Sequence, residues 1–295
     1  MKKFSDKRVI AKIDFKGPNL IKGIQFDGLR SLGNVRDFAL SYYKDGIDEI
    51  IFHDCVASLF NQEPKFELIK NYIENLFIPI TVSGGIKNLD HVKKMFAIGA
   101  DKVAINTAAV NDPNIIFEAA RIYGSQSIIA SVDLYREVIN YNEQDEFYIT
   151  HMYTHNGKEK IYKNYKEYLQ NISEEGAGEI LLNVITKDGT GRGCDIKLVN
   201  SVKEFTKVPI IYSGGVGTIK DILKLFQNTK VEAVALSSML HYYYYSKFTR
   251  QKQLSLRINN NTDYGNYDFY HNGYGGYKFF NTDRNSVKEI KKYFI

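Results

Sequence analysis

The chain repeats a glycine turn that follows an apolar segment, once in each half. Residues 79–82 and 209–212 both begin with proline and lead into Ser83-Gly84-Gly85 and Ser213-Gly214-Gly215-Val216-Gly217. Glycine lets backbone N–H groups approach an anion, and the positive end of a following helix adds to the attraction. One such turn can have a purely steric origin. Its repetition favours two phosphate sites in a duplicated barrel.

Two further features recur in the same order in both halves. An apolar segment that ends in aspartate precedes each glycine turn, with Asp14 in the first half and Asp133 in the second. A later apolar segment ends in small polar residues, Asn106-Thr107 or Ser237-Ser238. This order predicts two halves related by a pseudo-twofold axis.

Segments rich in valine and isoleucine alternate with amphipathic segments of helical length, the pattern of a parallel sheet covered by helices. We expect strands near residues 9–14, 49–54, 78–82, 102–106, 127–133, 179–184, 208–212 and 233–237. Helices are expected near residues 35–45, 63–76, 89–98, 113–123, 162–175, 195–206 and 219–228. Eight such units predict an α/β fold, a single (β/α)8 TIM barrel domain over residues 1–295.

Two segments depart from this alternation. Residues 137–160 alternate polar and β-favouring residues and contain Asn156-Gly157, which predicts an inserted hairpin. Residues 242–285 hold four consecutive tyrosines and a Tyr/Asn/Gly-rich run with little helical periodicity, which predicts an insertion in the loop between the eighth strand and the eighth helix. This insertion either has no role or forms a lid or partner contact on the rim. Residues 285–294 then predict a final helix with a serine cap.

Composition narrows the class of protein. The 39 basic residues are interspersed with 34 acidic ones, for a net charge of +5, which argues against a nucleic-acid partner. No segment approaches the roughly 18 apolar residues that a membrane span requires, and we expect a cytoplasmic protein. Cys55 and Cys194 are too few for a disulfide framework, and the histidines show no metal-binding spacing with them. We therefore expect neither a metal nor another cofactor.

Three acidic residues are candidates for the chemistry. Asp14 and Asp133 end strands, and the carboxyl ends of barrel strands carry the reacting groups. Two facing carboxylates can divide acid and base work if their surroundings separate their pKa values, although each could also be an ordinary turn or helix-cap residue. Asp188 and Gly189 lie in a glycine-rich loop after the sixth expected strand, which either folds over a phosphate or is a flexible turn.

Several short motifs occur together in one order along the chain: Ile21-Lys22-Gly23, Gly28-Leu29-Arg30, Asp48-Glu49-Ile50, Ala100-Asp101-Lys102-Val103, Ile105-Asn106-Thr107-Ala108-Ala109, Gly176-Ala177-Gly178-Glu179-Ile180-Leu181-Leu182 and Asp188-Gly189-Thr190. Single motifs of this set recur in other phosphosugar barrels. In this order, from Arg8 to about Tyr242 and again in the last helix, the chain resembles the cyclase subunit of imidazole glycerol phosphate synthase, the HisF family.

The resemblance implies an ammonia-dependent cyclase and lyase of histidine biosynthesis, which works as a heterodimer with a separate HisH-like glutaminase subunit. The implied substrate is a bis-phosphorylated ribulosyl formimino aminoimidazole carboxamide nucleotide, and the products are imidazole glycerol phosphate and aminoimidazole carboxamide ribotide. Asp14 and Asp133 match the catalytic pair, and Lys22 matches the lysine that reaches over the first phosphate. The residues that match one phosphate site are Gly84, Gly85, Asn106 and Thr107, and those that match the other are Gly214, Gly215, Gly217, Ser237 and Ser238.

Four charged residues at expected strand starts match the family's salt-bridged ring, where ammonia enters the bottom of the barrel: Arg8, Glu49, Lys102 and Glu179. Opposite charges in such a ring can neutralise one another where single buried charges could not. The simpler interpretation is that the ring only closes the barrel. As a gate, it implies that the glutaminase docks underneath.

The sequence departs from the family pattern at Phe15 to Leu20, Asn183 and Thr186, which leaves the substrate open. The main alternative is a HisF-like, ammonia-channelling subunit that amidates a sugar nucleotide in surface-polysaccharide biosynthesis, with a reshaped mouth and one phosphate site lost. A non-enzymatic phosphosugar-binding protein and an isomerase of the sister family are further alternatives. Retention of both aspartates and of the complete ring favours the histidine pathway.

Overall fold

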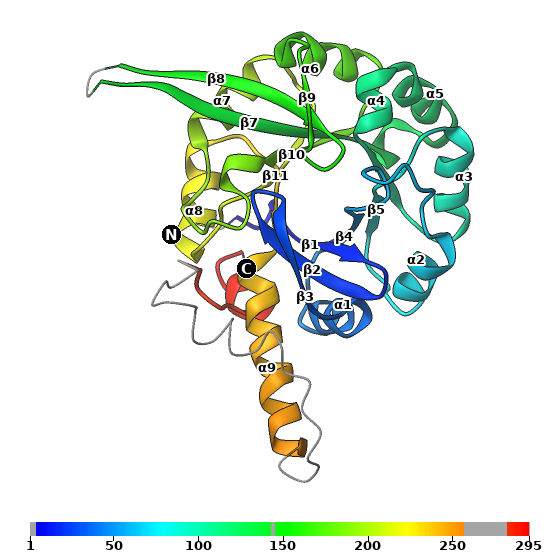
Figure 1. The fold of residues 1–295 in the computed structure, drawn as a ribbon, viewed down its shortest axis with the longest axis vertical. Helices are drawn as coiled ribbons and strands as arrows, with labels where there is room; N and C mark the ends of the chain where they lie inside the picture. The colour runs from blue at the N-terminus through cyan, green and yellow to red at the C-terminus, as the bar shows by residue number, and fades with distance from the viewer. Residues whose placement is uncertain (1–3, 143–144, 257–281, 295) are drawn as a thin grey trace.

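Eight parallel strands close into a barrel in the computed structural model, which describes residues 4–142, 145–256 and 282–294 (Figure 1). In the order of the sheet they are β1 (Arg8–Lys16), β4 (Glu49–Asp54), β5 (Ile80–Ser83), β6 (Lys102–Ile105), β7 (Ile128–Asn142), β10 (Glu179–Val184), β11 (Ile210–Ser213) and β12 (Ala233–Leu236). Parallel pairing of β12 with β1 and of β7 with β10 completes the closure. The expected strands and the predicted TIM barrel are confirmed.

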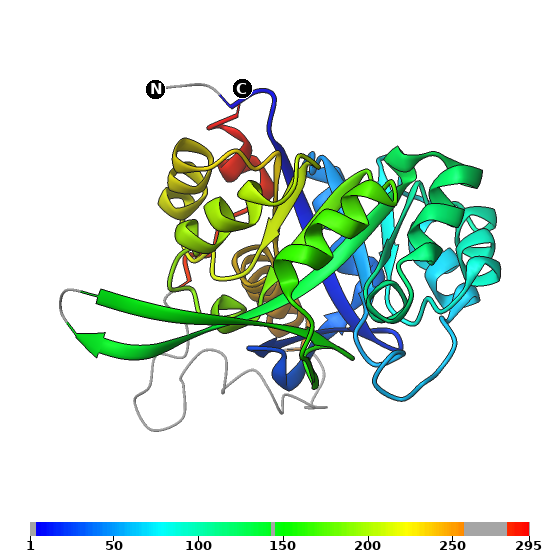
Figure 2. The same ribbon diagram turned by 90° about the horizontal axis from the view of Figure 1, so that it is seen from above.

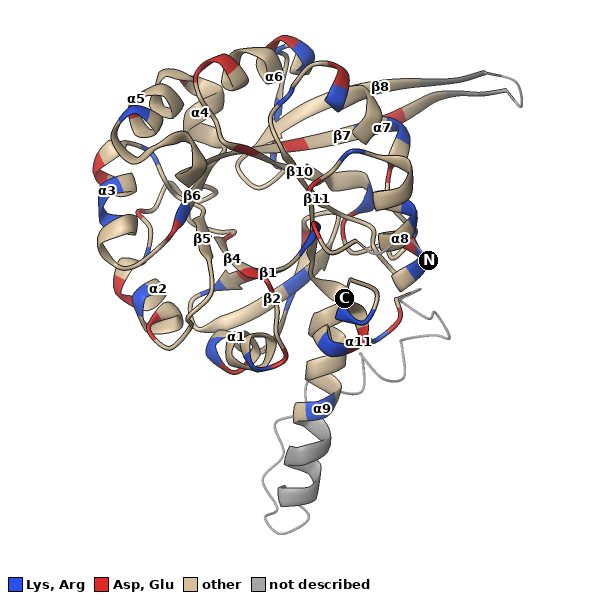
Figure 3. Ribbon diagram, turned by 180° about the vertical axis from the view of Figure 1, so that it is seen from behind, with Lys and Arg blue, Asp and Glu red and all other residues tan. Residues whose placement is uncertain are grey.

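Helices cover the outside of the barrel at the expected places. They are α1 (Val35–Lys44), α2 (Phe66–Ile73), α3 (Leu89–Ala97), α5 (Asn114–Tyr123), α6 (Tyr165–Glu174), α7 (Ile196–Glu204) and α8 (Ile219–Asn228), with a short α4 (Thr107–Asn111) before α5. Polar residues start several of them. The Asn34 side chain accepts from the Arg36 amide at α1, and Thr218 and Asp221 form a reciprocal capping box at α8. Basic and acidic residues are interspersed over these helices (Figure 3).

The inside of the barrel is built in layers because alternate residues of a strand point to the same face. On β1, Val9, Ala11 and Ile13 belong to the large apolar core between sheet and helices. Ile10 belongs instead to a separate buried cluster inside the barrel, whose other members are Ile51, Ala104, Ile129, Leu181, Ile211, Ala233 and Ala235. Charged residues lie at the strand starts below this apolar layer, and polar residues lie above it toward the strand ends.

Two hairpins extend from the carboxyl ends of the strands, on the side of the barrel opposite to the two termini (Figure 2). One is formed by β2 (Asn19–Ile24) and β3 (Asp27–Asn34), which we did not expect from the sequence. The other is formed by the long β7 with β8 (Asp145–Thr154), followed by β9 (Glu159–Ile161). The predicted hairpin in 137–160 is therefore confirmed, and Asn156-Gly157 forms the turn between β8 and β9.

The C-terminal part corrects one expectation. Residues 242–256 lack helical periodicity in sequence, yet they continue α9 (Ser238–Leu256). Tyrosines on both faces give no contrast between apolar and polar sides, although Tyr242 and Tyr244 are buried. The Tyr244 hydroxyl donates to Asp45 Oδ2 at 2.5 Å and accepts from the Val287 amide at 3.3 Å. The remainder of the predicted insertion, 257–281, lies outside the described residues.

The last helix confirms the prediction for the end of the chain. α11 (Val287–Lys291) begins after Ser286, whose side chain accepts from the Glu289 amide in a capping box. Val287 and Ile290 are buried against the core. Over residues 4–142, 145–256 and 282–294, no helix combines the length and apolar character needed to cross a membrane.

Candidate functional site

The two candidate carboxylates lie in strands on different sides of the barrel and are both buried. Asp14 Oδ1 accepts a hydrogen bond of 2.7 Å from Lys12 Nζ, two residues earlier on the same face of β1. Asp133 Oδ1 on β7 accepts one of 2.7 Å from Asn183 Nδ2 on β10. One carboxylate therefore has a cationic partner and the other a neutral one.

These surroundings separate the pKa values of the two aspartates. Burial alone would raise the pKa of Asp14, but the charges of Lys12, His53 and Lys22 and the bond from Lys12 lower it to about 2. Burial raises the pKa of Asp133 to about 6, against the hydrogen bond from Asn183. Asp14 is thus permanently ionised near neutral pH, whereas Asp133 can hold and release a proton there.

The first glycine turn opens into a cavity of about 770 Å³ at the carboxyl ends of β4 to β7. Its lining includes every predicted residue of the first phosphate site, Gly84, Gly85, Asn106 and Thr107, together with Asp133. The side-chain oxygen and nitrogen of Asn106 are buried and lack a hydrogen-bond partner among the described residues. A carboxamide left in this way is available to a ligand.

Glycine in the first turn also has a steric reason. A Cβ on Gly84 would lie 2.2 Å from the carbonyl oxygen of Asp54, and one on Gly85 would lie 2.7 Å from the Ala57 Cβ. Both residues have positive φ angles, 99° and 71°. The turn therefore requires glycine whether or not it holds a phosphate, and the assignment to phosphate rests on the cavity beside it.

The second glycine turn is nearly closed. The space beside it is about 20 Å³ and is lined by Asp188, Gly189, Gly214, Gly215, Ser237 and Ser238, among others. The β2–β3 hairpin packs against the loop that carries Asp188, because the Gln25 backbone amide donates to the Asp188 carbonyl at 2.9 Å and Lys22 Nζ contacts Asp188 Oδ2 at 2.7 Å. Lys22 is thus on the side of the second site in this structure, and its role over the first phosphate stays a prediction.

Two residues of the predicted second site are engaged within the protein. The Gly217 amide donates to Asp221 Oδ2 at 3.1 Å, as part of the cap of α8, and Gly217 is not among the residues that line the space. Ser237 Oγ donates to the Lys12 carbonyl at 2.9 Å and so joins the end of β12 to β1. The turn around Gly214 and Gly215 therefore provides the remaining backbone amides of this site.

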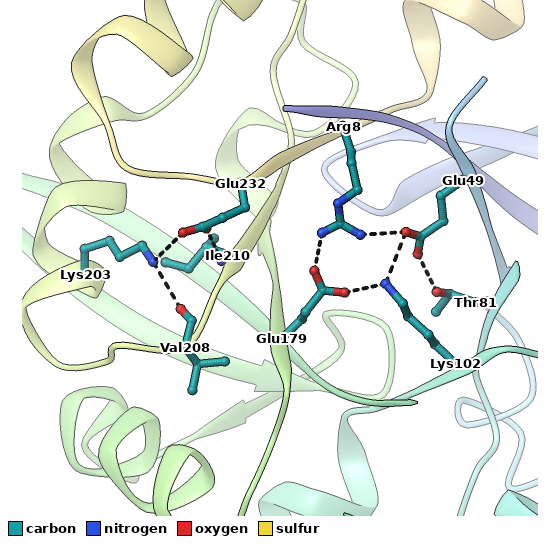
Figure 4. Close-up of polar contacts among 9 residues, drawn as sticks. All are labelled: Arg8, Glu49, Thr81, Lys102, Glu179, Lys203, Val208, Ile210 and Glu232. Carbon is teal, nitrogen blue, oxygen red and sulfur yellow. Dashed lines mark hydrogen bonds and ion pairs between the residues drawn. The ribbon is translucent and has the colours of Figure 1, made fainter. Parts of the chain in front are cut away.

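The four ring residues meet at the bottom of the barrel (Figure 4). Arg8 contacts Glu49 at 2.7 Å and also pairs with Glu179, while Lys102 Nζ lies 2.7 Å from Glu179 and 3.3 Å from Glu49. Glu49 additionally accepts from Thr81 Oγ1 at 2.7 Å. The charges alternate around the ring, so that each carboxylate lies between two cations.

Three polar residues at the mouth were not predicted from the sequence: Lys12, His53, and Asn183 as the partner of Asp133. Lys12 precedes Asp14 by two residues and His53 follows Glu49 by four, so the two-residue period of a strand places each on the inward face. That signal was present in the sequence. Within the described parts of the chain, no group of three or more His, Cys, Asp or Glu side chains is arranged to hold a metal ion.

Comparisons with known proteins agree with the resemblance. A family model described as "Histidine biosynthesis protein" matches residues 8–246. Subunit HisF of imidazole glycerol phosphate synthase from Legionella pneumophila is 43% identical over 217 residues, which cover 74% of this chain and 99% of the relative. The HisF subunits of Petrotoga mobilis and Thermococcus onnurineus are 36% and 35% identical, over 81% and 86% of this chain and 92% and 98% of those relatives.

Proposed function

The chain belongs to the family of histidine biosynthesis proteins that includes the HisF subunits of imidazole glycerol phosphate synthase, and we propose from this premise how its site works. It acts as the cyclase subunit of that synthase, an enzyme of histidine biosynthesis with lyase activity. The observation that carries the mechanism is the pair of buried aspartates on different sides of the barrel, Asp14 bound to Lys12 and Asp133 bound to Asn183, with Asp133 lining the cavity.

The substrate of this reaction is a bis-phosphorylated ribulosyl formimino aminoimidazole carboxamide nucleotide. Its first phosphate binds beside Gly84 and Gly85, where the Asn106 carboxamide and Thr107 supply further polar groups. The second phosphate binds at Gly214 and Gly215 with Ser238. Because the space there is only about 20 Å³, binding requires the loop of Asp188, to which the β2–β3 hairpin is bonded, to move. The arriving anion then competes with Asp188 for Lys22.

The aspartates act on the middle of the substrate, where ammonia attacks a carbonyl and water leaves. Asp133 supplies a proton to the carbonyl oxygen as it gains charge, since its pKa of about 6 keeps a protonated fraction available near neutral pH. Asp14 stays ionised and stabilises the positive charge that develops on the attacking nitrogen. Ring closure and cleavage of a C–N bond then give imidazole glycerol phosphate and aminoimidazole carboxamide ribotide.

The subunit works with a glutaminase subunit, which we place at the bottom of the barrel. The support is the ring of Arg8, Glu49, Lys102 and Glu179, which spans the barrel at the end opposite to the aspartates. Arg8 and Lys102 keep 30% and 18% of their side chains exposed, so the ring can be reached from outside. Separation of Lys102 from a glutamate would open a path for ammonia into the barrel.

Turnover with ammonia alone tests this function without the partner. The purified chain is given the bis-phosphorylated nucleotide and ammonium salt at a pH where free ammonia is abundant, and loss of substrate absorbance and formation of both products are followed. Formation of imidazole glycerol phosphate is the expected result. Tight binding without turnover, together with amidation of a sugar nucleotide in a parallel assay, would favour the polysaccharide pathway instead.

A further inference from the structure

A histidine lies in the row of polar side chains that faces the proposed reaction. His53 is the fifth residue of β4, in register with Asp14 on β1 and with Ser83 on β5. Residues paired in this way on neighbouring strands point to the same face of a sheet. His53 also lines the 770 Å³ cavity together with Asp133. The imidazole is therefore beside one catalytic carboxylate and in the same cavity as the other.

The turn between β8 and β9 orients this imidazole. His53 Nε2 lies 3.4 Å from Asn156 Oδ1, and because an amide oxygen only accepts, this contact favours the tautomer with the proton on Nε2. Nδ1 then keeps its lone pair, and it has no hydrogen-bond partner among the described residues. His155, Asn156 and Gly157 all have positive φ angles, and a Cβ on Gly157 would lie 2.9 Å from Phe26. The turn is thus held against the β2–β3 hairpin.

The proposed reaction needs a proton acceptor that the aspartates do not provide at this position. Asp14 is bound to Lys12 at 2.7 Å and has a pKa of about 2, so it takes a proton poorly. Asp133 is still protonated when the nitrogen attacks, because it donates that proton to the carbonyl oxygen, and it can accept a proton only in the step that follows. The attacking nitrogen, once bonded to carbon, must still lose a proton.

We propose that His53 is a further catalytic residue, whose Nδ1 accepts the proton of the attacking nitrogen; this rests on the proposed function. The nitrogen lone pair forms the new C–N bond, the carbonyl π electrons move to oxygen, and that oxygen takes the proton of Asp133. In the next step protonated His53 returns its proton to the hydroxyl, which leaves as water. Asp133 takes a proton from the nitrogen as the C=N bond forms. His53 and Asp133 thereby regain their starting protonation states.

The charges that face His53 are consistent with this role. Burial and the charge of Lys12 lower the pKa of His53 to about 4, against the opposite influences of Asp14 and of the bond to Asn156, so the imidazole is neutral near neutral pH and one ring nitrogen carries no proton. The other ionisable side chains that line the cavity are Asp133, His155, Lys87, Asp90, Asp112 and Glu118. A bound bis-phosphate adds negative charge and raises the proton affinity of His53 when the substrate is present.

The test compares His53→Gln with His151→Gln in the ammonium-driven assay. Glutamine keeps a polar side chain of similar size but accepts no proton, so kcat should fall about 100-fold while KM stays within about threefold. His151 lies on β8, contacts Lys160 and does not line the cavity, and its variant should retain full activity. Asn156→Gly, which suits the positive φ of that position, should lower kcat about tenfold by releasing His53.

Chemical rescue separates a catalytic role from a structural one. Added imidazole should raise the kcat of His53→Ala by at least about tenfold and should have no effect on the kcat of the wild type. Equal kcat values for His53→Gln and the wild type would overturn the inference and leave the proposed function intact. Inactivity of the wild type itself would overturn the proposed function and the inference together. If kcat falls in His53→Gln but imidazole does not rescue His53→Ala, His53 has a structural role and the inference is overturned.

Discussion

Replacement of Asp133 by asparagine should abolish turnover and stabilise the protein at the same time. In the folded protein the pKa of Asp133 is about 6, compared with 3.8 for an unperturbed aspartate. At about 1.4 kcal/mol for each pH unit, this difference means that ionised Asp133 lowers the free energy of unfolding by about 3 kcal/mol. Asparagine removes that penalty, and the Asn183 Oδ1 atom, which is buried without a partner among the described residues, can accept from the new amide.

The sign of the effect follows from the raised pKa. The contribution of Asp133 to the free energy of unfolding is fully present only below the pKa that this residue has in the unfolded chain. It is lost as the pH rises toward and through about 6. The gain of Asp133→Asn should therefore be largest above pH 7 and should fall below about 1 kcal/mol at pH 4. For a chain of 295 residues, 3 kcal/mol corresponds to a rise in Tm of about 5 °C.

Thermal and urea unfolding of the variant and the wild type at pH 8 and pH 4, followed by circular dichroism, measure this difference. Turnover in the ammonium-driven assay should fall by about 100-fold or more, because the proton donor is lost. The predicted penalty of ionised Asp133 would be refuted if the variant were no more stable than the wild type at pH 8. It would also be refuted if the gain in stability were the same at pH 8 and pH 4.

Three further predictions follow from single contacts, one of them with a control variant. Asp14→Asn should also abolish turnover, but it should destabilise the protein by about 3 kcal/mol or more in urea unfolding, because it leaves Lys12 buried without its carboxylate. Lys102→Met should change the ratio of glutamine-driven to ammonium-driven turnover by at least about threefold. Lys203→Met, outside the ring, removes the pair with Glu232 (Figure 4) and should leave that ratio unchanged. Tyr244→Phe should lower the free energy of urea unfolding by about 1 to 2 kcal/mol, through the bonds to Asp45 and Val287.

Most of the barrel could be predicted from the sequence because strand and helix periods are local properties. Segments such as 179–184 and 219–228 carry their own pattern, and the structure places β10 and α8 there. α9 could not be predicted in this way. The sequence of α9 shows no polar face, so the helix is not visible as a local pattern. It is stabilised by packing against α1, where the rings of Tyr244 and Tyr42 lie 5.0 Å apart between centroids.

The candidate site residues could be predicted where a reactive residue type stands at the end of a strand. Their hydrogen-bond and ion-pair partners could be predicted much less well, because these come from distant elements. Asp14 and Asp133 were identified because aspartate follows an apolar strand. The pairing of Lys22 with Asp188 was not predicted, because it joins residues 166 positions apart through a hairpin that has no clear signal in the sequence. The difference in pKa between the two aspartates depends on such partners and not on the aspartates themselves.

The layers inside the barrel explain why the two ends can have different tasks. β1 alone contributes Arg8 to the ring, Ile10 to the apolar layer, and Lys12 and Asp14 to the mouth. Asp14 follows Arg8 by six positions, which amounts to about 20 Å of strand. Between them the apolar layer, partly of small residues such as Ala104, Ala233 and Ala235, offers no partner to a charged ion. Neutral ammonia can cross such a layer at much lower cost than ammonium, because an unpaired charge in apolar surroundings is strongly unfavourable. In the proposed function the apolar layer therefore selects the form of nitrogen that can attack a carbonyl, and the nitrogen becomes charged only where Asp14 and His53 can receive it.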